Sequence, residues 1–160
     1  MKWLWLSLAV FILDQGSKLA VAGMMQLYES IPVMPCLNLT YVHNPGAAFS
    51  FLSNAGGWQR WFFAGLAVII SIGLTVWLST LQKQEVLLAT ALSLILGGAV
   101  GNLIDRLIYG YVIDFIDVYY RDWHWPAFNI ADSAITLGIM LMVAETLGLG
   151  KSKKEMTTDS

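Results

Sequence analysis

Three aspartates lie in apolar sequence in the second half of the chain. Asp114 and Asp117 belong to the run GYVIDFIDVYY, and Asp132 belongs to AFNIADSA. Two neighbouring carboxylates that share one proton can hydrolyse a peptide bond. The ionised one takes a proton from the attacking water, while the protonated one hydrogen-bonds the carbonyl oxygen and later helps to protonate the leaving nitrogen. This chemistry requires no metal and no cofactor.

Asp132 also has a structural explanation. Asn129 lies three residues before it, which is the spacing of a capping box at the start of a helix. Acidic side chains are favoured in the first turn of a helix in any case. For the other acid, spacing alone does not decide between Asp114 and Asp117.

The elements that must position these acids are membrane helices. The chain has 160 residues, of which 57% are hydrophobic and 12% charged, and its mean hydropathy is +0.63, outside the usual balance of a soluble domain. A membrane helix needs about 20 mostly apolar residues. Four runs meet this requirement: 3–22, 60–80, 86–106 and 129–149. We expect an all-α membrane protein with a small β element, formed by one four-helix domain over 1–150.

Basic residues predict the orientation of these spans. Five lie on one side of the membrane, namely Lys2, Lys83, Lys151, Lys153 and Lys154. Three lie on the other, namely Arg60, Arg106 and Arg121. Because basic residues are enriched in cytoplasmic loops, both termini are expected in the cytoplasm, with 151–160 as a polar tail. The loops 23–59 and 107–128 then face outward.

The first outer loop contains a strand pattern. LNLTYVHN (37–44) alternates apolar and polar residues and ends in a turn at Asn44, Pro45 and Gly46. The apolar run 47–52 that follows could pair back as a hairpin or lie over a groove between helices. A small β element is therefore expected on the outer membrane surface.

The third apolar run combines packing residues and polar residues. Gly97 and Gly101 form a G-x-x-x-G face that allows another helix to approach closely. Asn102, Asp105 and Arg106 share one side of the end of this helix. An Asp/Arg pair there could anchor polar loop backbone near the membrane surface, and direct chemistry is the alternative role.

Other classes of site are not supported by the composition. The net charge of −2 without a basic stripe gives no reason to expect nucleic-acid binding. The single Cys36 excludes an intramolecular disulfide and a cysteine metal site. His43 and His124 lack the spacing of a zinc motif, so no metal site is predicted.

A small proton-coupled transporter or channel is the alternative function. Asp14, Lys18, Asp114 and Asp132 would then form an intramembrane relay. Only Asp14 and Lys18 lie within a span, however, and their i, i+4 spacing lets them form a structural ion pair. No inverted repeat is recognisable. A purely structural subunit would explain the glycines but not the acids.

The chain resembles lipoprotein signal peptidase, also called signal peptidase II, along essentially its whole length. Five motifs carry the resemblance in order: LDQGSK (13–18), NPGAAFSF (44–51), GGAVGNLIDR (97–106), VIDF (112–115) and FNIADS (128–133). The resemblance implies a bacterial inner-membrane aspartic endopeptidase with four spans and an outward-facing active site. It also implies an extracytoplasmic β-cradle built from the first outer loop.

The resemblance assigns roles to individual residues. It implies that Asp114 and Asp132 are the catalytic pair. Residues implied to bind substrate or support the site are Asn44, Gly46, Ala48, Asn102, Asp105, Arg106, Asn129 and Ala131, and the first-helix motif contributes Asp14 and Lys18. The implied substrate is a prolipoprotein that carries diacylglycerol on a cysteine, and cleavage removes the signal peptide just before that cysteine. Inhibition by globomycin-type peptide antibiotics is also implied.

The capping pattern then predicts which acid of this pair holds the proton. Asp132 would lie beside unpaired backbone N–H groups in a first helical turn, where negative charge is favoured. Asp114 lies in an apolar segment, which disfavours its charged form. We therefore expect Asp132 to be mostly ionised and Asp114 to be mostly protonated near neutral pH.

Overall fold

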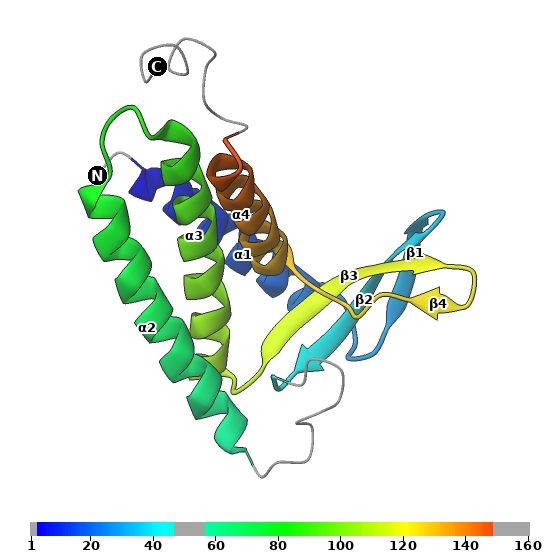
Figure 1. The fold of residues 1–160 in the computed structure, drawn as a ribbon. Helices are drawn as coiled ribbons and strands as arrows, with labels where there is room; N and C mark the ends of the chain where they lie inside the picture. Colours follow the sequence, from blue (N-terminus) through cyan, green and yellow to red (C-terminus); the bar gives the residue numbers. More distant parts are fainter. Residues whose placement is uncertain (1–2, 47–56, 149–160) are drawn as a thin grey trace.

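Four long helices and a small sheet make up the structure, a computed structural model that describes residues 3–46 and 57–148 (Figure 1). In chain order the elements are α1 (Leu4–Met24), β1 (Ser30–Met34), β2 (Leu37–Asn44), α2 (Trp58–Thr80), α3 (Val86–Ile108), β3 (Val112–Tyr120), β4 (Trp123–His124) and α4 (Ile130–Thr146). The sheet extends from the end of the helix bundle where α1 ends and α4 begins (Figure 1). The turn between α2 and α3 lies at the opposite end (Figure 1).

Three helices in the described part of the chain are long and apolar enough to cross a membrane, not the four that were predicted. They are α1, α2 and α3, with 21, 23 and 23 residues and mean hydropathies of 1.4, 2.1 and 2.0. The fourth predicted span, 129–149, corresponds to α4, which has only 17 residues. At 1.5 Å per residue α4 is about 26 Å long, slightly short of the hydrocarbon core.

Local signals at both ends explain why α4 is short. Asn129 has an extended backbone and caps the first turn with its side chain. At the other end, Gly148 adopts a positive φ of 76°, and its N–H donates to the Glu145 carbonyl. A glycine in the left-handed region commonly ends a helix, so α4 ends at Thr146, short of the predicted bound of 149.

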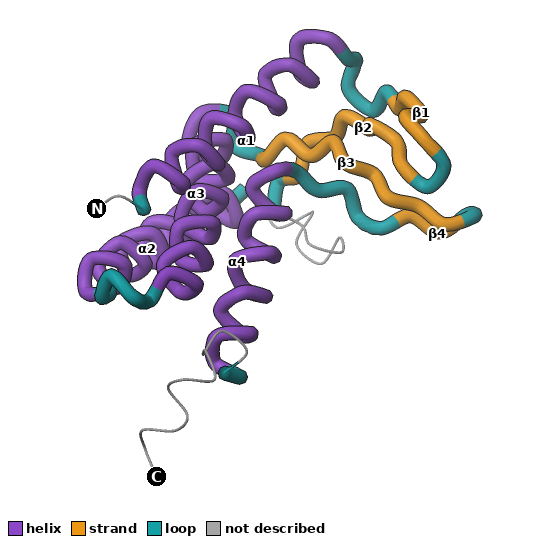
Figure 2. Tube along the Cα trace, turned by 90° about the horizontal axis from the view of Figure 1, so that it is seen from above, coloured by secondary structure: helices purple, strands orange, loops and turns teal. Residues whose placement is uncertain are grey.

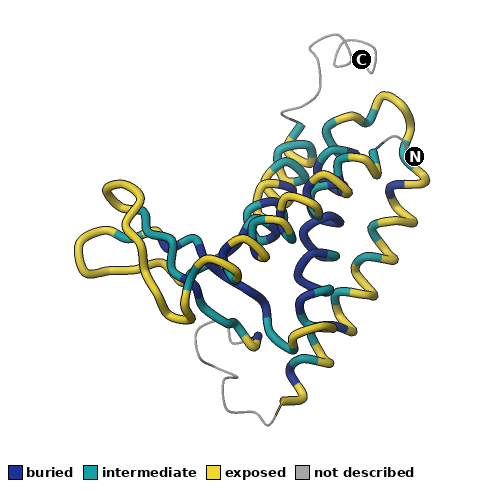
Figure 3. The backbone as a smooth tube through the Cα atoms, turned by 180° about the vertical axis from the view of Figure 1, so that it is seen from behind, coloured by how far each residue is buried: buried dark blue, intermediate teal, exposed yellow. Residues whose placement is uncertain are grey.

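The helix α3 is the centre of the bundle and packs against α1, α2 and α4. Figure 3 shows α3 mostly buried, whereas α2 is exposed along most of its length. The glycines permit this packing: a Cβ at Gly97 would lie 2.6 Å from the Ser7 carbonyl oxygen of α1, and one at Gly98 would overlap the Ala131 carbonyl oxygen of α4. The expected close approach at the G-x-x-x-G face is confirmed.

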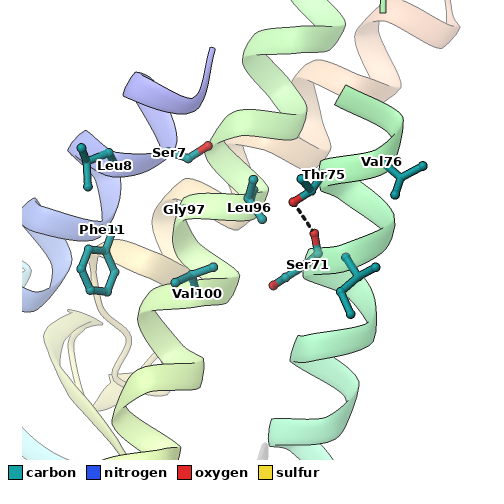
Figure 4. A pocket seen from close by; sticks show the side chains of 10 residues that line it. Ser7, Leu8, Phe11, Ser71, Thr75, Val76, Leu96, Gly97 and Val100 are labelled. Atoms are coloured by element: carbon teal, nitrogen blue, oxygen red, sulfur yellow. Dashed lines mark hydrogen bonds between the residues drawn. The ribbon is translucent and has the colours of Figure 1, made fainter. Parts of the chain in front are cut away.

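An apolar groove of about 470 Å³ separates α1 from α2 on the surface of α3 (Figure 4). Its wall includes Phe11 of α1, Thr75 of α2 and Val100 of α3. Large apolar side chains on the rest of α2 are also exposed, including Phe62 and Ile69. Such a surface is unusual for a soluble protein and suits a helix in contact with lipid.

The sheet is antiparallel, with strand order β1-β2-β3-β4 (Figure 2). The predicted strand 37–44 is present with the same bounds. Its partners are β1 and β3, while the run 47–52 and Ala48 lie outside the described residues. The loop 23–59 supplies β1 and β2, as expected of the small β element, and the loop 107–128 extends the same sheet with β3 and β4.

A compact apolar cluster joins the sheet to the bundle. Val21 of α1 packs with Tyr41 of β2 and with Ile113 and Phe115 of β3. In β3 the four residues from Val112 onward are all buried, so this end of the strand is covered on both faces. The cluster fixes the start of β3 against the helices and thereby fixes Asp114.

Candidate active site

Asp114 is a buried carboxylate in the covered half of β3. In the sheet it is paired with Val42 of β2, two residues before Asn44. Asn44 Nδ2 donates to Asp114 Oδ2 over 2.9 Å, and Asn129 Nδ2 donates to Asp114 Oδ1 over 2.7 Å. Each carboxylate oxygen therefore has an amide donor, one from β2 and one from the residue that caps α4.

Asp132 lies in the first turn of α4, in the capping box that the sequence predicted. The Asp132 N–H donates to Asn129 Oδ1 over 2.9 Å, and the Asn129 N–H donates to Asp132 Oδ2 over 3.3 Å. The other oxygen, Asp132 Oδ1, accepts a hydrogen bond of 2.8 Å from Asn102 Nδ2 of α3. Capping fixes the position of Asp132 and leaves its carboxylate half-buried beside the site.

Asn129 links the two acids. Its side chain donates to the Asp114 carboxylate and accepts from the Asp132 backbone N–H, and it is fully buried. Burial, and after it the negative charge of Asp132, raise the pKa of Asp114 to about 7. The hydrogen bonds from Asn44 and Asn129 oppose this shift. Asp114 is therefore suited to hold a proton near neutral pH, as the sequence led us to expect.

Asp117, the competing acid, belongs to a separate network three residues further along β3. Asn38 Nδ2 and Thr40 Oγ1 donate to Asp117 Oδ2 over 3.1 and 3.2 Å. His124 Nδ1 lies 2.8 Å from Asp117 Oδ1. Because successive side chains alternate across a strand, Asp114 and Asp117 point to opposite faces of the sheet. Among the described residues no hydrogen bond or ion pair joins Asp117 to Asp132, and the partners of Asp117 lie further along the sheet.

A buried ionic cluster lies beneath the two acids. Lys18 Nζ lies 2.8 Å from Asp14 Oδ2 and 2.9 Å from Asp105 Oδ2. The i, i+4 pair predicted in the first helix is therefore present, and it has a third member from α3. The second oxygen of Asp14 accepts from the Ala131 N–H of α4 over 2.9 Å. The cluster thus ties α1 to both helices that carry site residues.

The partner predicted for Asp105 was wrong. Among the described residues no ion pair joins Asp105 to Arg106, because Asp105 faces Lys18. Asp105 also accepts a hydrogen bond from the start of β3, where the Ile113 N–H donates to Asp105 Oδ2 over 3.2 Å. Arg106 Nη1 instead donates to the Asn102 carbonyl over 3.2 Å, and its guanidinium lies 5.4 Å from the centre of the Phe63 ring.

Gly46 supports the site through Asn44. Its N–H donates to Asn44 Oδ1 over 2.9 Å, which leaves Asn44 Nδ2 directed at Asp114. Gly46 has a positive φ of 104°, and a Cβ there would lie 2.7 Å from Phe63 Cδ2. A side chain at this position would be both strained and obstructed.

Comparison with known proteins identifies the family. The model of the family described as signal peptidase (SPase) II matches residues 6–148. The chain belongs to the signal peptidase II family. The lipoprotein signal peptidase of Alteromonas mediterranea is 54% identical over 155 residues, covering 97% of this chain and 85% of that protein. The one from Shewanella piezotolerans is 51% identical over 155 residues, covering 97% and 91%.

Solved structures agree with the signal peptidase II assignment. A bacterial membrane enzyme determined by the in meso method at 2.3 Å resolution has a TM-score of 0.82 and 35% sequence identity, covering 95% of this chain and 93% of that chain. A second, at 1.9 Å resolution, has a TM-score of 0.79 with 35% identity and covers 95% and 94%. The transporter or channel alternative receives no support from these relatives.

One polar residue of this signal peptidase II chain was not selected from its sequence. Gln15 Nε2 donates to Asp105 Oδ1 over 2.8 Å and to Asp14 Oδ2 and the Gly101 carbonyl over 3.2 Å each. It therefore bridges the two carboxylates on either side of Lys18. Its polarity within an apolar helix, next to Asp14, was the available signal.

Proposed function

We propose that the chain is an aspartic endopeptidase that removes the signal peptide from diacylglyceryl-modified prolipoproteins by cutting just before the lipidated cysteine. The observation that carries this proposal is that Asn129 contacts both carboxylates: its side-chain Nδ2 donates to Asp114 Oδ1 and its backbone N–H donates to Asp132 Oδ2. Two carboxylates held together in this way have the arrangement that acid–base hydrolysis of a peptide requires. The family and the names of the relatives supply the substrate class.

The two acids have different roles in this mechanism. Asp114, whose pKa is raised to about 7 by burial first and by Asp132 second, donates a hydrogen bond to the scissile carbonyl oxygen. Asp132, whose carboxylate lies at the N-terminus of α4, takes a proton from the attacking water. Asp114 then delivers its proton to the leaving nitrogen. Asp132, which now holds the proton taken from water, passes that proton to Asp114, and the pair returns to its starting state. Asn44, Asn102 and Asn129 hold the acids through their amides.

A groove that begins at Asp132 suits a lipidated substrate. It has a volume of about 590 Å³ and follows α4 from Asp132 through Thr136 and Leu137 to Met140, with Trp125 on its other wall. Each buried CH₂ of an acyl chain contributes about 0.8 kcal/mol. Acyl chains on the cysteine next to the scissile bond could use this binding energy to position the peptide against the acids.

The location follows from the same mechanism. We propose that the protein lies in the bacterial inner membrane with α4 as its fourth span, both termini in the cytoplasm and the acids toward the periplasmic face. The end of the bundle that carries the sheet also carries the acids, and the turn with Lys83 lies at the other end (Figure 1). The roles of Ala48 and of the tail 151–160 concern residues outside the described ranges and remain part of this proposal.

The deciding experiment is cleavage of a purified precursor in lipid or detergent. The wild-type protein should cut a diacylglyceryl precursor before its cysteine and should cut the same precursor without diacylglycerol poorly. Globomycin-type peptides should inhibit the reaction. Proton-driven flux in liposomes without any cleavage would contradict the proposal and favour the transporter.

A further inference from the structure

The ammonium group of Lys18 has three hydrogen-bond acceptors in the interior of the bundle. Its ammonium nitrogen lies 2.8 Å from Asp14 Oδ2, 2.9 Å from Asp105 Oδ2 and 2.9 Å from Asn102 Oδ1. A lysine ammonium has three hydrogens and no lone pair. Each hydrogen therefore has one acceptor, and the third acceptor is a neutral amide and not a carboxylate.

The contact with Lys18 determines how the amide of Asn102 is turned. Since an ammonium group can only donate, the atom that faces it must be the amide oxygen. Asn129 Nδ2 is a second donor to Asn102 Oδ1, at 3.3 Å. A flipped amide would direct its NH₂ group at these two donors and lose both hydrogen bonds. The amide nitrogen must therefore point away from Lys18, where it donates to Asp132 Oδ1 over 2.8 Å.

We propose that Lys18 is a positioning residue for the catalytic pair, because it holds Asn102 in the one amide orientation that can donate to Asp132. The inference rests on the proposed aspartic peptidase and gives its first-helix lysine a role beyond that of a structural ion pair. Among the described residues no hydrogen bond or ion pair joins Lys18 to Asp114 or Asp132, so its geometric link to the pair runs through Asn102.

The cluster around Lys18 is built to keep this orientation fixed. Asp14 is held from its other side by the Ala131 N–H, and Asp105 is held by Gln15 Nε2 and the Ile113 N–H. Lys18 and both carboxylates are almost fully buried. A buried charge that loses its partner is costly, so none of these groups readily turns away.

Lys18 also places a positive charge near the pair, which predicts an effect on pH dependence. The charged groups that face the site are Asp14 and Lys18 of α1, Asp105 and Arg106 of α3, Asp114 of β3 and Asp132 of α4. Among the influences on Asp114, the charge of Lys18 lowers the pKa, although burial and Asp132 raise it more. Without Lys18 the pKa of Asp114 should rise, and the alkaline limb of activity should move to higher pH.

A double-mutant cycle tests the inference. Lys18→Met and Asn102→Ala should each lower kcat about tenfold or more with little change in KM, and the double variant should be no worse than Asn102→Ala alone. Multiplied losses in the double variant would show that Lys18 does not act through Asn102 and would overturn the inference. If the Lys18→Met variant folds and its kcat is unchanged, the inference is overturned as well.

Ser7→Ala is the matched control for helix packing. Ser7 Oγ donates to the Ser93 carbonyl over 2.9 Å, a buried hydrogen bond between α1 and α3 that contacts none of the charged groups. Ser7→Ala should leave the pH profile of kcat unchanged, whereas Lys18→Met should move its alkaline limb to higher pH. An equal shift in both variants would reveal a packing effect and contradict the positioning role.

A second variant covers the case in which Lys18→Met does not fold. Lys18→Met combined with Asp105→Asn removes one negative charge together with the positive one, so the cluster keeps its net charge. This variant should still lose kcat and should show the same lack of additivity with Asn102→Ala. Failure of the proposed function is recognised separately, because wild-type protein would then not cleave the lipidated precursor at all.

Discussion

Asn129 Nδ2 lies 2.7 Å from Asp114 Oδ1, and the same residue caps the helix that carries the second acid. A helix cap normally serves only its own helix. Here the cap also reaches the strand β3, so the start of α4 and the buried carboxylate of β3 are positioned by one side chain. Predictions about either acid are therefore also predictions about their shared partner.

Replacing either acid of the pair should remove most of the activity. Asp114→Asn and Asp132→Asn should each lower kcat for a lipidated precursor by at least about 100-fold, because each variant loses one of two proton-transfer groups. Asp117→Asn is the matched control in the same strand and should have a much milder effect. Near-normal turnover by either of the first two variants would disprove the assignment of the pair.

Asn44→Ala should shift the pH dependence. Asp114 must be protonated to donate to the carbonyl, so activity should fall as pH rises through its pKa, which lies at about 7. The hydrogen bond from Asn44 lowers this pKa, so its removal should raise the pKa and move the alkaline limb of kcat/KM to higher pH. Thr40→Ala is the control, because Thr40 lies in β2 as Asn44 does but donates to Asp117. This variant should leave the alkaline limb of kcat/KM unchanged.

Filling the groove along α4 should weaken substrate binding. Leu137→Trp places a larger side chain in the groove beside Asp132 and should raise KM for the lipidated precursor about tenfold, with less effect on kcat. Val143→Trp is a suitable control, because Val143 is on the same helix and is 49% exposed, as Leu137 is, but does not line the groove. Equal effects of the two tryptophans would argue against lipid binding in this groove.

Chelation should not affect the reaction. In the proposed mechanism both proton transfers are carried out by Asp114 and Asp132, and neither step uses a metal. Activity measured after treatment with EDTA should equal that of untreated protein. Inhibition that zinc reverses would instead indicate a metallopeptidase, with His43 and His124 as the first residues to test.

Labelling of cysteine should report the orientation. Cys36 is exposed in the turn between β1 and β2, and a membrane-impermeant thiol reagent should reach it from the periplasmic side. In a Cys36→Ser background, Lys83→Cys should react only after the inner face is opened, because the turn between α2 and α3 lies at the other end of the bundle (Figure 1). The reverse pattern would contradict the proposed orientation and the outward-facing site.

Several features were predictable because they depend on residues close together in the sequence. The capping box of Asn129 and Asp132 and the ion pair of Asp14 and Lys18 involve spacings of three and four residues. The strand 37–44 shows its alternation within one short segment. The length of α4 was overestimated, because hydropathy alone extended the span past Gly148. The backbone conformation of Gly148 ends the helix earlier.

The partners of the buried polar groups were decided by the tertiary structure. Asp105 could face Arg106 or Lys18, and only the rotation of α3 against α1 selects the lysine, 87 positions away in the chain. Asp114 and Asp117 have equally suitable sequence surroundings, and only the pairing of β3 with β2 directs Asp114 to the cap of α4 and Asp117 to Asn38. Residue order alone sets which polar side chains lie in the membrane helices and which local turns form there. Helix rotation and strand register determined which of these groups meet, because both depend on packing between segments that are distant in sequence.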